Sequence, residues 1–249
     1  MRPDRKPLGL ALVIGVVALA LLAVLQTPGL AAAAPDAGHG ESHGREIAPA
    51  LHPVPVAVSA WPPALILILG AVLLPLIPVR ALRAALAVAL PAVALWVIWG
   101  LPDGARLVVP FAGYDLHVLQ ADRLSLIFGK IFALVGVIAG IYAFHTGDRR
   151  QQVAALLYNA GALGVTFAGD YFTLYGFWEL MAVSSTILIW ARDSEDSQRA
   201  GRRYILVHLA GGAVLLFGIF LHVQGTGSIL IERFAPGPTI RNRPLEWLS

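Results

Sequence analysis

The sequence predicts an all-α polytopic membrane protein with six to seven transmembrane helices. Hydrophobic residues make up 57% of the 249-residue chain, charged residues make up only 13%, and the mean hydropathy is +0.73. Soluble domains are about 45–50% apolar and about 25% charged, so this composition excludes an ordinary soluble domain. Two further observations agree: apolar segments recur along the chain, and Lys and Arg gather in alternate loops between them.

Seven apolar segments are candidates to cross a hydrocarbon core about 30 Å thick, which needs about 17–25 helical residues. Two of them are short, but flanking residues can be drawn into the interface to complete a span. The segments are 8–25, 62–77, 81–99, 124–144, 153–168, 172–190 and 204–223.

The first segment resembles a secretory signal, because a basic start precedes an apolar stretch and small residues near Ala32 and Ala34. We expect residues 1–34 to be a signal peptide or an N-terminal anchor helix. Residues 35–61 are rich in Pro, Gly, Ala and His and predict an extracytoplasmic linker. The transmembrane bundle is then expected at 62–223, and an extracytoplasmic tail at 224–249.

Positive charge orients the segments, since cytoplasmic loops of membrane proteins carry an excess of Lys and Arg. This rule predicts a multi-pass protein of a bacterial-type inner (plasma) membrane, with the lipid bilayer as its surroundings. The surplus of positive charge is therefore a topology signal, and no nucleic-acid partner is expected. The basic residues of the predicted cytoplasmic loops are Arg2, Arg5, Lys6, Arg80, Arg83, Arg149, Arg150, Arg192, Arg199, Arg202 and Arg203.

The chain contains no Cys. Iron–sulfur clusters, disulfides and thiol catalysis all need cysteine sulfur, so none of them is expected on this chain. His39 and His43 lie close together in the linker, where two imidazoles alone do not define a metal site. We therefore expect no cofactor and no bound metal.

Glu179 is the strongest functional candidate, because it is the only carboxylate in the apolar run 172–190. A charge near the centre of a bilayer costs about 2.5–3.5 kcal/mol on insertion scales, so such residues usually face a protein interior or a wet cavity and take part in transport. The alternative is a carboxyl held neutral by neighbouring helices without a transport role.

Lys130 and His208 are the other candidates for a proton path. Lys130 lies about 9 Å and Glu179 about 10 Å along helices that enter from the same side, at 1.5 Å per residue, so a Lys130–Glu179 pair is one hypothesis. A Lys130 side chain that reaches the outer interface is the alternative. His208 titrates near neutrality and could relay protons, or it could be a helix-end histidine bonded to a carbonyl.

Several other residues have structural as well as functional interpretations. Asp170, in the outer turn before 172–190, could line a proton exit or cap a helix. Ser184 and Ser185 could bond across helices or only pack. The mixed-charge run 192–203 predicts a solvated cytoplasmic loop.

The chain from Asp122 to Gly227 resembles the proton-translocating antiporter family. This family includes the D-type chain of Mrp sodium/proton antiporters and the antiporter-like subunits of complex I and membrane hydrogenases. The resemblance lies in Asp122-Arg123-Leu124-Ser125, Gly169-Asp170, Leu174-Tyr175, Phe177-Trp178-Glu179, Ser184-Ser185, Tyr204, Gly211-Gly212, Leu215, Gly218 and Thr226-Gly227.

The resemblance implies that Glu179 matches the family's buried glutamate, whose charge state is coupled to a lysine on the following helix. Family members have roughly fourteen helices in two inverted repeats, and this sequence covers only the N-terminal portion, with the first six of them. We therefore expect partner subunits, including a chain that supplies the remaining helices, unless this is a truncated product.

The predicted function is a membrane subunit of a multi-subunit cation/proton antiporter that moves protons and, in some relatives, Na+. The alternative is a proton-pumping membrane subunit of a complex I-like NADH:quinone oxidoreductase or membrane hydrogenase. A scaffold that keeps the fold without the chemistry is a third. The chain is more readily a transporter subunit than an enzyme; an enzymatic role would be that of a cofactor-free, proton-translocating subunit of a redox complex.

Overall fold

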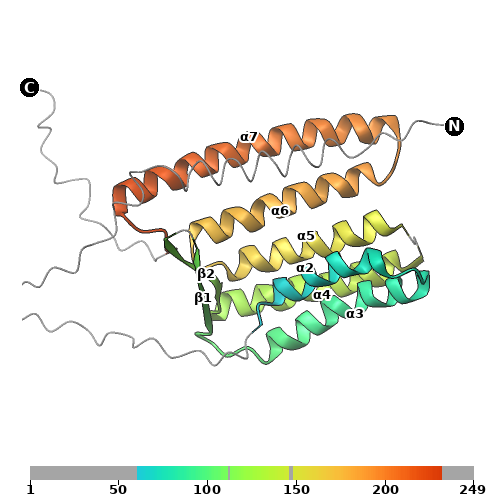
Figure 1. The fold of residues 1–249 in the computed structure, drawn as a ribbon, viewed down its shortest axis with the longest axis horizontal. Helices are drawn as coiled ribbons and strands as arrows, with labels where there is room; N and C mark the ends of the chain where they lie inside the picture. The colour runs from blue at the N-terminus through green and yellow to red at the C-terminus, as the bar shows by residue number, and fades with distance from the viewer. Residues whose placement is uncertain (1–60, 112, 146–147, 232–249) are drawn as a thin grey trace, which may run out of the picture.

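The computed structural model describes residues 61–111, 113–145 and 148–231, which form a bundle of antiparallel helices with a β-hairpin across one end (Figure 1). The predicted signal or anchor, most of the linker with His39 and His43, and the end of the tail lie outside the described residues. The elements are α2 (Pro63–Leu73), η2 (Leu74–Leu76), α3 (Arg80–Trp99), β1 (Arg106–Phe111), β2 (Tyr114–Gln120), α4 (Arg123–Tyr142), η3 (Ala143–His145), α5 (Arg149–Phe167), α6 (Tyr171–Trp190) and α7 (Glu195–Thr226).

The predicted polytopic helical fold is confirmed. In the described part of the chain, four helices are long and apolar enough to cross a membrane, namely α3, α4 continued by η3, α6 and α7. Helix α2 is apolar but shorter. Helix α5 has 19 residues, is less apolar, and runs between α4 and α6.

Helix α5 is the centre of the bundle, since it packs against α2, α4 and α6. Small residues permit the close approach to α6: a Cβ added at Gly161 or Gly164 would collide with Met181 or Phe177. Ala160 and Leu163 of α5 are fully buried in the main apolar core. Dense packing around α5 therefore sets the position of α6, which carries Glu179.

The two ends of the bundle differ in charge. One end collects the segments 77–80, 143–145, 148–149 and 190–195, and it includes Arg80, Arg149 and Arg192. We call this end the basic face. The other end carries the hairpin, and we call it the hairpin face.

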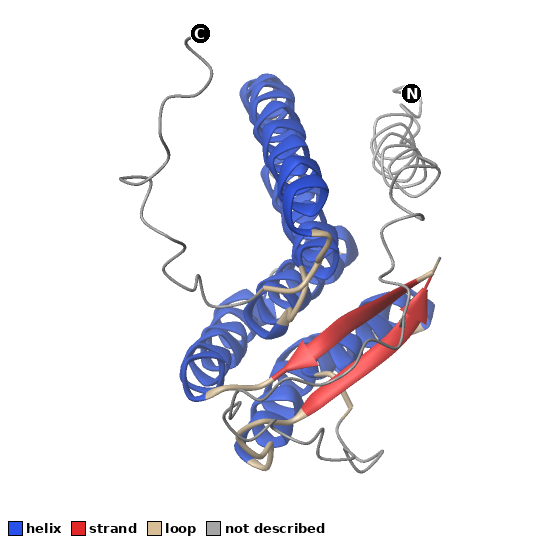
Figure 2. Ribbon diagram, turned by 90° about the vertical axis from the view of Figure 1, so that its left-hand side faces the viewer, coloured by secondary structure: helices blue, strands red, loops and turns tan. Residues whose placement is uncertain are grey.

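The hairpin is an element that sequence analysis missed, because residues 100–122 lie between the apolar segments 81–99 and 124–144 and carry only a weak strand signal. Strands β1 and β2 pair antiparallel, with Phe111 opposite Tyr114 and a bulge between Leu107 and Val108. Gly113 in the turn has a φ of 84°, a backbone conformation that glycine adopts at no steric cost. Figure 2 shows the two strands lying across the ends of the helices.

Helix α7 corrects a second expectation. The run 192–203 was predicted to be a solvated loop, but α7 begins at Glu195 with a capping box between Ser194 and Ser197. Two acidic residues in its first turn favour this start, since negative charge stabilises a helix N-terminus. At 32 residues, α7 is about 48 Å long, which exceeds the hydrocarbon thickness. It packs mainly on α6 (Figure 1).

Candidate functional site

Glu179 lies near the middle of α6, and its side chain is almost completely buried. Only 2% of the residue is exposed, and neither carboxylate oxygen has a hydrogen-bond partner of normal geometry. A buried carboxyl without partners is costly in any structural role, because desolvation is not repaid by hydrogen bonds. The arrangement is therefore better suited to a group that gains and loses a proton than to a stabilising contact.

Gly212 of α7 makes room for this carboxyl. A Cβ added at Gly212 would collide with Oε1 of Glu179 and lie 3.3 Å from Cδ. The carboxyl therefore points at the backbone of α7, and every larger residue at 212 would displace it. The sequence marked Gly212 only as part of the family resemblance, since its role depends on which face of α7 meets α6.

Tyr175 precedes Glu179 by one helical turn and is 4% exposed. Its hydroxyl is close enough to the carboxyl to interact with it electrostatically. Residues four apart lie on the same helix face, so α6 itself supplies a phenol beside the carboxyl. The spacing of four residues along α6 is sufficient to bring the side chains of Tyr175 and Glu179 together.

His208 lies on α7 one turn before Gly212 and faces the same seam between α6 and α7. Its ring centroid is 5.9 Å from that of Trp178 and 5.8 Å from that of Tyr204. Its Nε2 atom is buried without a hydrogen-bond partner. With α7 beginning at Glu195, His208 stands about 20 Å along the helix, well inside the bundle.

A groove of about 520 Å³ follows this seam from the basic half of the bundle towards the middle. It passes His208 and reaches Gly212, behind which the Glu179 carboxyl lies. The structure therefore brings Glu179 and His208 to one seam. The residues that line the groove are Trp178, Arg203, Tyr204, Val207, His208, Gly211, Gly212 and Leu215.

The hypothesised Lys130–Glu179 pair is not formed. The Nζ atom of Lys130 lies 5.0 Å from the centre of the Trp99 ring, a cation–π geometry that turns it towards α3. Helix α5 stands between α4 and α6. The Lys130 side chain is directed towards α3 and the Glu179 carboxyl towards α7, so any role of Lys130 in a proton path remains a prediction.

Asp170 was expected either to line a proton exit or to cap a helix, and the structure shows the helix cap. It is fully buried, and its carboxylate accepts hydrogen bonds from the Thr173 amide (2.7 Å), the Thr173 hydroxyl (2.6 Å) and the His117 amide (2.7 Å). The first two cap α6 and the third ties β2 to it. Asp170 therefore joins the hairpin to the helix that carries Glu179.

The serines of α6 divide between the two expectations. The Ser185 hydroxyl donates to the Tyr204 hydroxyl of α7 at 3.0 Å, a bond across helices. Ser184 bonds to the backbone carbonyl of Leu180 in its own helix. Within residues 61–111, 113–145 and 148–231, no cluster of three or more His, Asp or Glu side chains could hold a metal ion.

Comparison with known proteins agrees with this architecture. Residues 168–240 match the family described as NADH:quinone oxidoreductase/Mrp antiporter, transmembrane. This region contains α6 with Glu179 and α7 with His208 and Gly212. The family match therefore falls on the seam described above.

Individual relatives cover more of the chain. The N-type chain of an NADH-quinone oxidoreductase from Deinococcus radiodurans is 29% identical over 190 residues, which are 70% of this chain and 38% of the relative. The D-type chain of a Na(+)/H(+) antiporter from Bacillus subtilis is 29% identical over 45% of this chain and 24% of its own length. A putative antiporter subunit mnhA2 of Staphylococcus epidermidis is 35% identical over 45% of this chain and 15% of its own length.

A solved structure shares the fold. A chain of the membrane-bound sulfane sulfur reductase, an archaeal respiratory membrane complex, superposes with a TM-score of 0.62 at 28% identity, over 68% of this chain and 28% of that one. The chain thus spans well under half the length of these relatives. The resemblance predicted from the sequence is confirmed: this is a multi-pass membrane protein whose residues 168–240 match the transmembrane domain of the NADH:quinone oxidoreductase/Mrp antiporter family.

Proposed function

We propose that this chain is a membrane subunit of a multi-subunit cation/proton antiporter and that Glu179 carries part of its proton path. The single observation that supports this most is the burial of the Glu179 carboxyl, without hydrogen-bond partners, against Gly212. Ionisable residues inside membranes are costly and usually mark proton or ion pathways.

His208 is the proposed entry side of this path. It lies between the basic face and Glu179 along the groove of the α6–α7 seam, and its Nε2 atom is free to bind water or a proton. A proton would pass from the basic face to His208, then through water in the groove to the carboxyl behind Gly212. Na+ is a second proposed substrate, because one relative is named as part of a Na(+)/H(+) antiporter.

The alternative proposal is a proton-pumping subunit of a respiratory complex. It rests on the relatives named as NADH-quinone oxidoreductase subunits and on the solved respiratory membrane complex. In both proposals the chain works beside other membrane subunits. The proposed membrane is a bacterial plasma membrane.

Proton flux in inverted native membrane vesicles tests the role of Glu179. Vesicles that contain the full chain with its natural partners are given a Na+ or K+ gradient, and the internal pH is followed with an acridine dye. We expect Glu179→Gln to reduce the pH change to that of membranes without the chain, since an amide cannot exchange a proton.

The matched control is Glu195→Gln, which makes the same chemical change at an exposed carboxylate in the first turn of α7. This variant should keep normal flux. Wild-type flux in Glu179→Gln at equal protein abundance would refute the proposed path. Mass spectrometry of the co-purifying subunits then separates the two proposals: antiporter subunits alone support the first, and flavin or iron–sulfur subunits support the second.

A further inference from the structure

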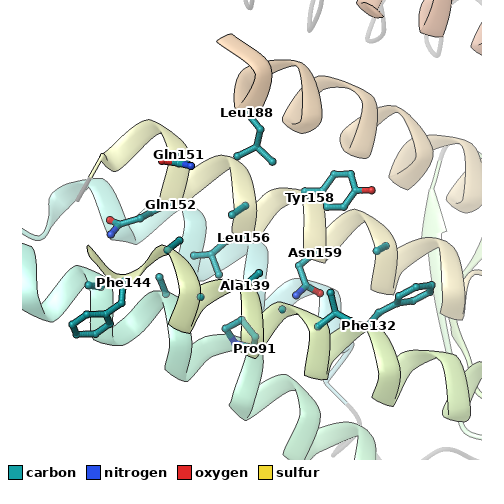
Figure 3. A pocket seen from close by; sticks show the side chains of 18 residues that line it. Pro91, Phe132, Ala139, Phe144, Gln151, Gln152, Leu156, Tyr158, Asn159 and Leu188 are labelled. Carbon is teal, nitrogen blue, oxygen red and sulfur yellow. The ribbon is translucent and has the colours of Figure 1, made fainter. Parts of the chain in front are cut away.

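A groove between α4 and α5 opens on the outside of the bundle (Figure 3). It has a volume of about 220 Å³, and its walls are formed almost wholly by apolar atoms. Four large side chains stand along it and are between 37% and 55% exposed, namely Phe132, Val135, Phe144 and Tyr158. In a protein that spans a membrane, this exposed rim faces acyl chains of the bilayer or another membrane subunit. We call this feature the α4–α5 groove.

Small residues of three helices form the hollow. Two polar side chains also lie along it, but the unpaired atoms of Gln152 and Asn159 are buried and do not form its surface. Carbon atoms that have no neighbour on one side lose their dispersion contacts, so apolar walls favour an apolar occupant. The small residues that line the groove are Ala84, Ala87, Gly136, Ala139, Gly140, Ala143, Ala155 and Ala162.

The length of the groove matches the depth of one leaflet. Its lining runs from Phe132 to Phe144 along α4 and η3, and from Gln151 to Ala162 along α5. At 1.5 Å per residue these stretches are about 18 Å and about 16 Å long. Half of a hydrocarbon core about 30 Å thick is about 15 Å. An acyl chain that enters the groove at the basic face would therefore end near mid-membrane.

Two exposed arginines lie beside the end of the groove at the basic face. Arg80 precedes the groove-lining Ala84 by one turn on the same side of α3. Its Nη2 atom donates a hydrogen bond to the carbonyl oxygen of His145, at the end of η3, with a distance of 2.6 Å. Arg149 begins α5, nearly one turn before the groove-lining Gln152. Positive charge from two helices therefore stands at this end of an apolar groove.

Both guanidinium groups can still bind an anion. The ion pairs among the residues that the structure describes include neither Arg80 nor Arg149. The carboxylate at this end, Asp148, is engaged by the neighbouring Arg150: it accepts the Arg150 amide at 2.9 Å and lies 3.9 Å from its Nε atom. A guanidinium has five N–H donors, so Arg80 keeps donors for phosphate oxygens beside its bond to His145.

We propose that the α4–α5 groove binds an anionic phospholipid, with one acyl chain in the groove and the phosphate held by Arg80 and Arg149. The basic face is the predicted cytoplasmic side, and basic pockets between transmembrane helices on that side bind anionic head groups. Apolar walls alone would accept a chain of any lipid, so the arginines supply the selectivity for negative charge. The site uses none of the residues that line the α6–α7 groove and does not depend on Glu179 carrying a proton.

Photo-cross-linking with two lipids tests the site. The full chain with its natural partners is placed in phosphatidylcholine nanodiscs that contain a small fraction of a lipid with a diazirine on one acyl chain. This lipid is either phosphatidylglycerol, which is anionic, or phosphatidylcholine, which is zwitterionic. The cross-linked residues are identified by mass spectrometry of peptides. Ile138, exposed on α4 outside the groove, is the reference position for lipid that is not selected by the site.

We expect phosphatidylglycerol to cross-link the groove at least about fivefold more than phosphatidylcholine, because basic residues at a membrane surface attract anionic lipid. The double variant Arg80→Gln/Arg149→Gln should reduce this cross-linking to the level of phosphatidylcholine. Arg199→Gln is the matched control, since it makes the same change at an exposed arginine of α7 and should leave the preference intact. Ala155→Leu should reduce cross-linking of the groove by both lipids, whereas Ala89→Leu, at an exposed position of α3 outside the groove, should not.

Three results would overturn the proposal. Equal cross-linking of the groove by the two lipids in the wild-type protein would indicate bulk lipid without selection. Cross-linking at Ile138 without any in the groove would indicate that a helix of a partner subunit covers it. A preference for phosphatidylglycerol that persists in the double arginine variant would refute the role of Arg80 and Arg149. The first two comparisons use only the wild-type protein, so they decide the proposal even if Ala155→Leu does not accumulate.

Discussion

Replacing Asp170 should release the hairpin from α6 and destabilise the protein strongly. The carboxylate accepts hydrogen bonds from two backbone amides, those of Thr173 and His117, and from the Thr173 hydroxyl. Asp170→Ala leaves both amides buried and unpaired at about 1–3 kcal/mol each. The loss of the helix cap is part of the same change, so the total is about 4 kcal/mol.

The assay is thermal unfolding of the full chain in mild detergent, followed by intrinsic tryptophan fluorescence. At about 2–4 °C per kcal/mol for a chain of this size, Asp170→Ala should lower the Tm by about 8–16 °C. Asp170→Asn keeps one acceptor oxygen and should have a smaller effect. Amide hydrogen exchange should rise selectively in β2, because the His117 amide loses its acceptor.

Asp103→Ala is the matched control on the same face. Asp103 forms an exposed ion pair with Arg123, with an N···O distance of 3.3 Å, and such pairs contribute less than about 1 kcal/mol. Two results would refute the predicted role of Asp170. One is a decrease in Tm for Asp170→Ala that is no larger than the decrease for Asp103→Ala, and the other is unchanged amide hydrogen exchange in β2.

Three further outcomes are expected. Gly212→Ala places a methyl group where the Glu179 carboxyl lies, so proton flux should fall sharply. Gly211→Ala should be tolerated, because nothing lies within 4 Å of a methyl group added there. Equal flux in both variants would contradict the packing of Glu179 against Gly212. Lys130→Met removes the cation over the Trp99 ring and should cost about 0.5–2 kcal/mol in thermal unfolding, with no loss if the contact is absent. Burial raises the pKa of Tyr114 above its ordinary value of 10.0, so the phenol ionises first in the unfolded protein and the stability of the fold should decrease as the pH rises above 10. Tyr114→Phe should remove this decrease. Parallel Tm–pH curves for the wild-type protein and Tyr114→Phe would argue against it.

The sequence was sufficient to locate the long apolar helices along the chain. Hydropathy over a window of helix length depends only on composition, so the boundaries of 172–190 and 124–144 fall within two residues of the observed helices α6 and α4. The hairpin was not predicted because its strands are short, and alternation of apolar and polar residues over six or seven positions is a weak signal. The extension of α7 to Glu195 was not predicted because hydropathy does not distinguish its charged first turns from a loop.

The sequence could not predict which neighbouring helix each side chain faces. The sequence predicts similar depths for Lys130 and Glu179, and only the position of α5 between their helices shows that they do not meet. The spacing of Gln152 and Asn159 is evident in the chain, but only the tertiary structure places both residues along one hollow with Gly136 and Gly140 of α4.

The sequence by itself determined that this is a helical membrane protein that resembles the antiporter-like family and has one carboxylate in the sixth apolar segment, because composition, periodicity and motif order are properties of the chain alone. The tertiary structure decided which groups face each other: Glu179 against Gly212, His208 on the same seam, Asp170 under the hairpin and the amides of α5 around a cavity. The physical reason is that a helix places side chains on all sides, and only packing against particular neighbours selects the side that is buried.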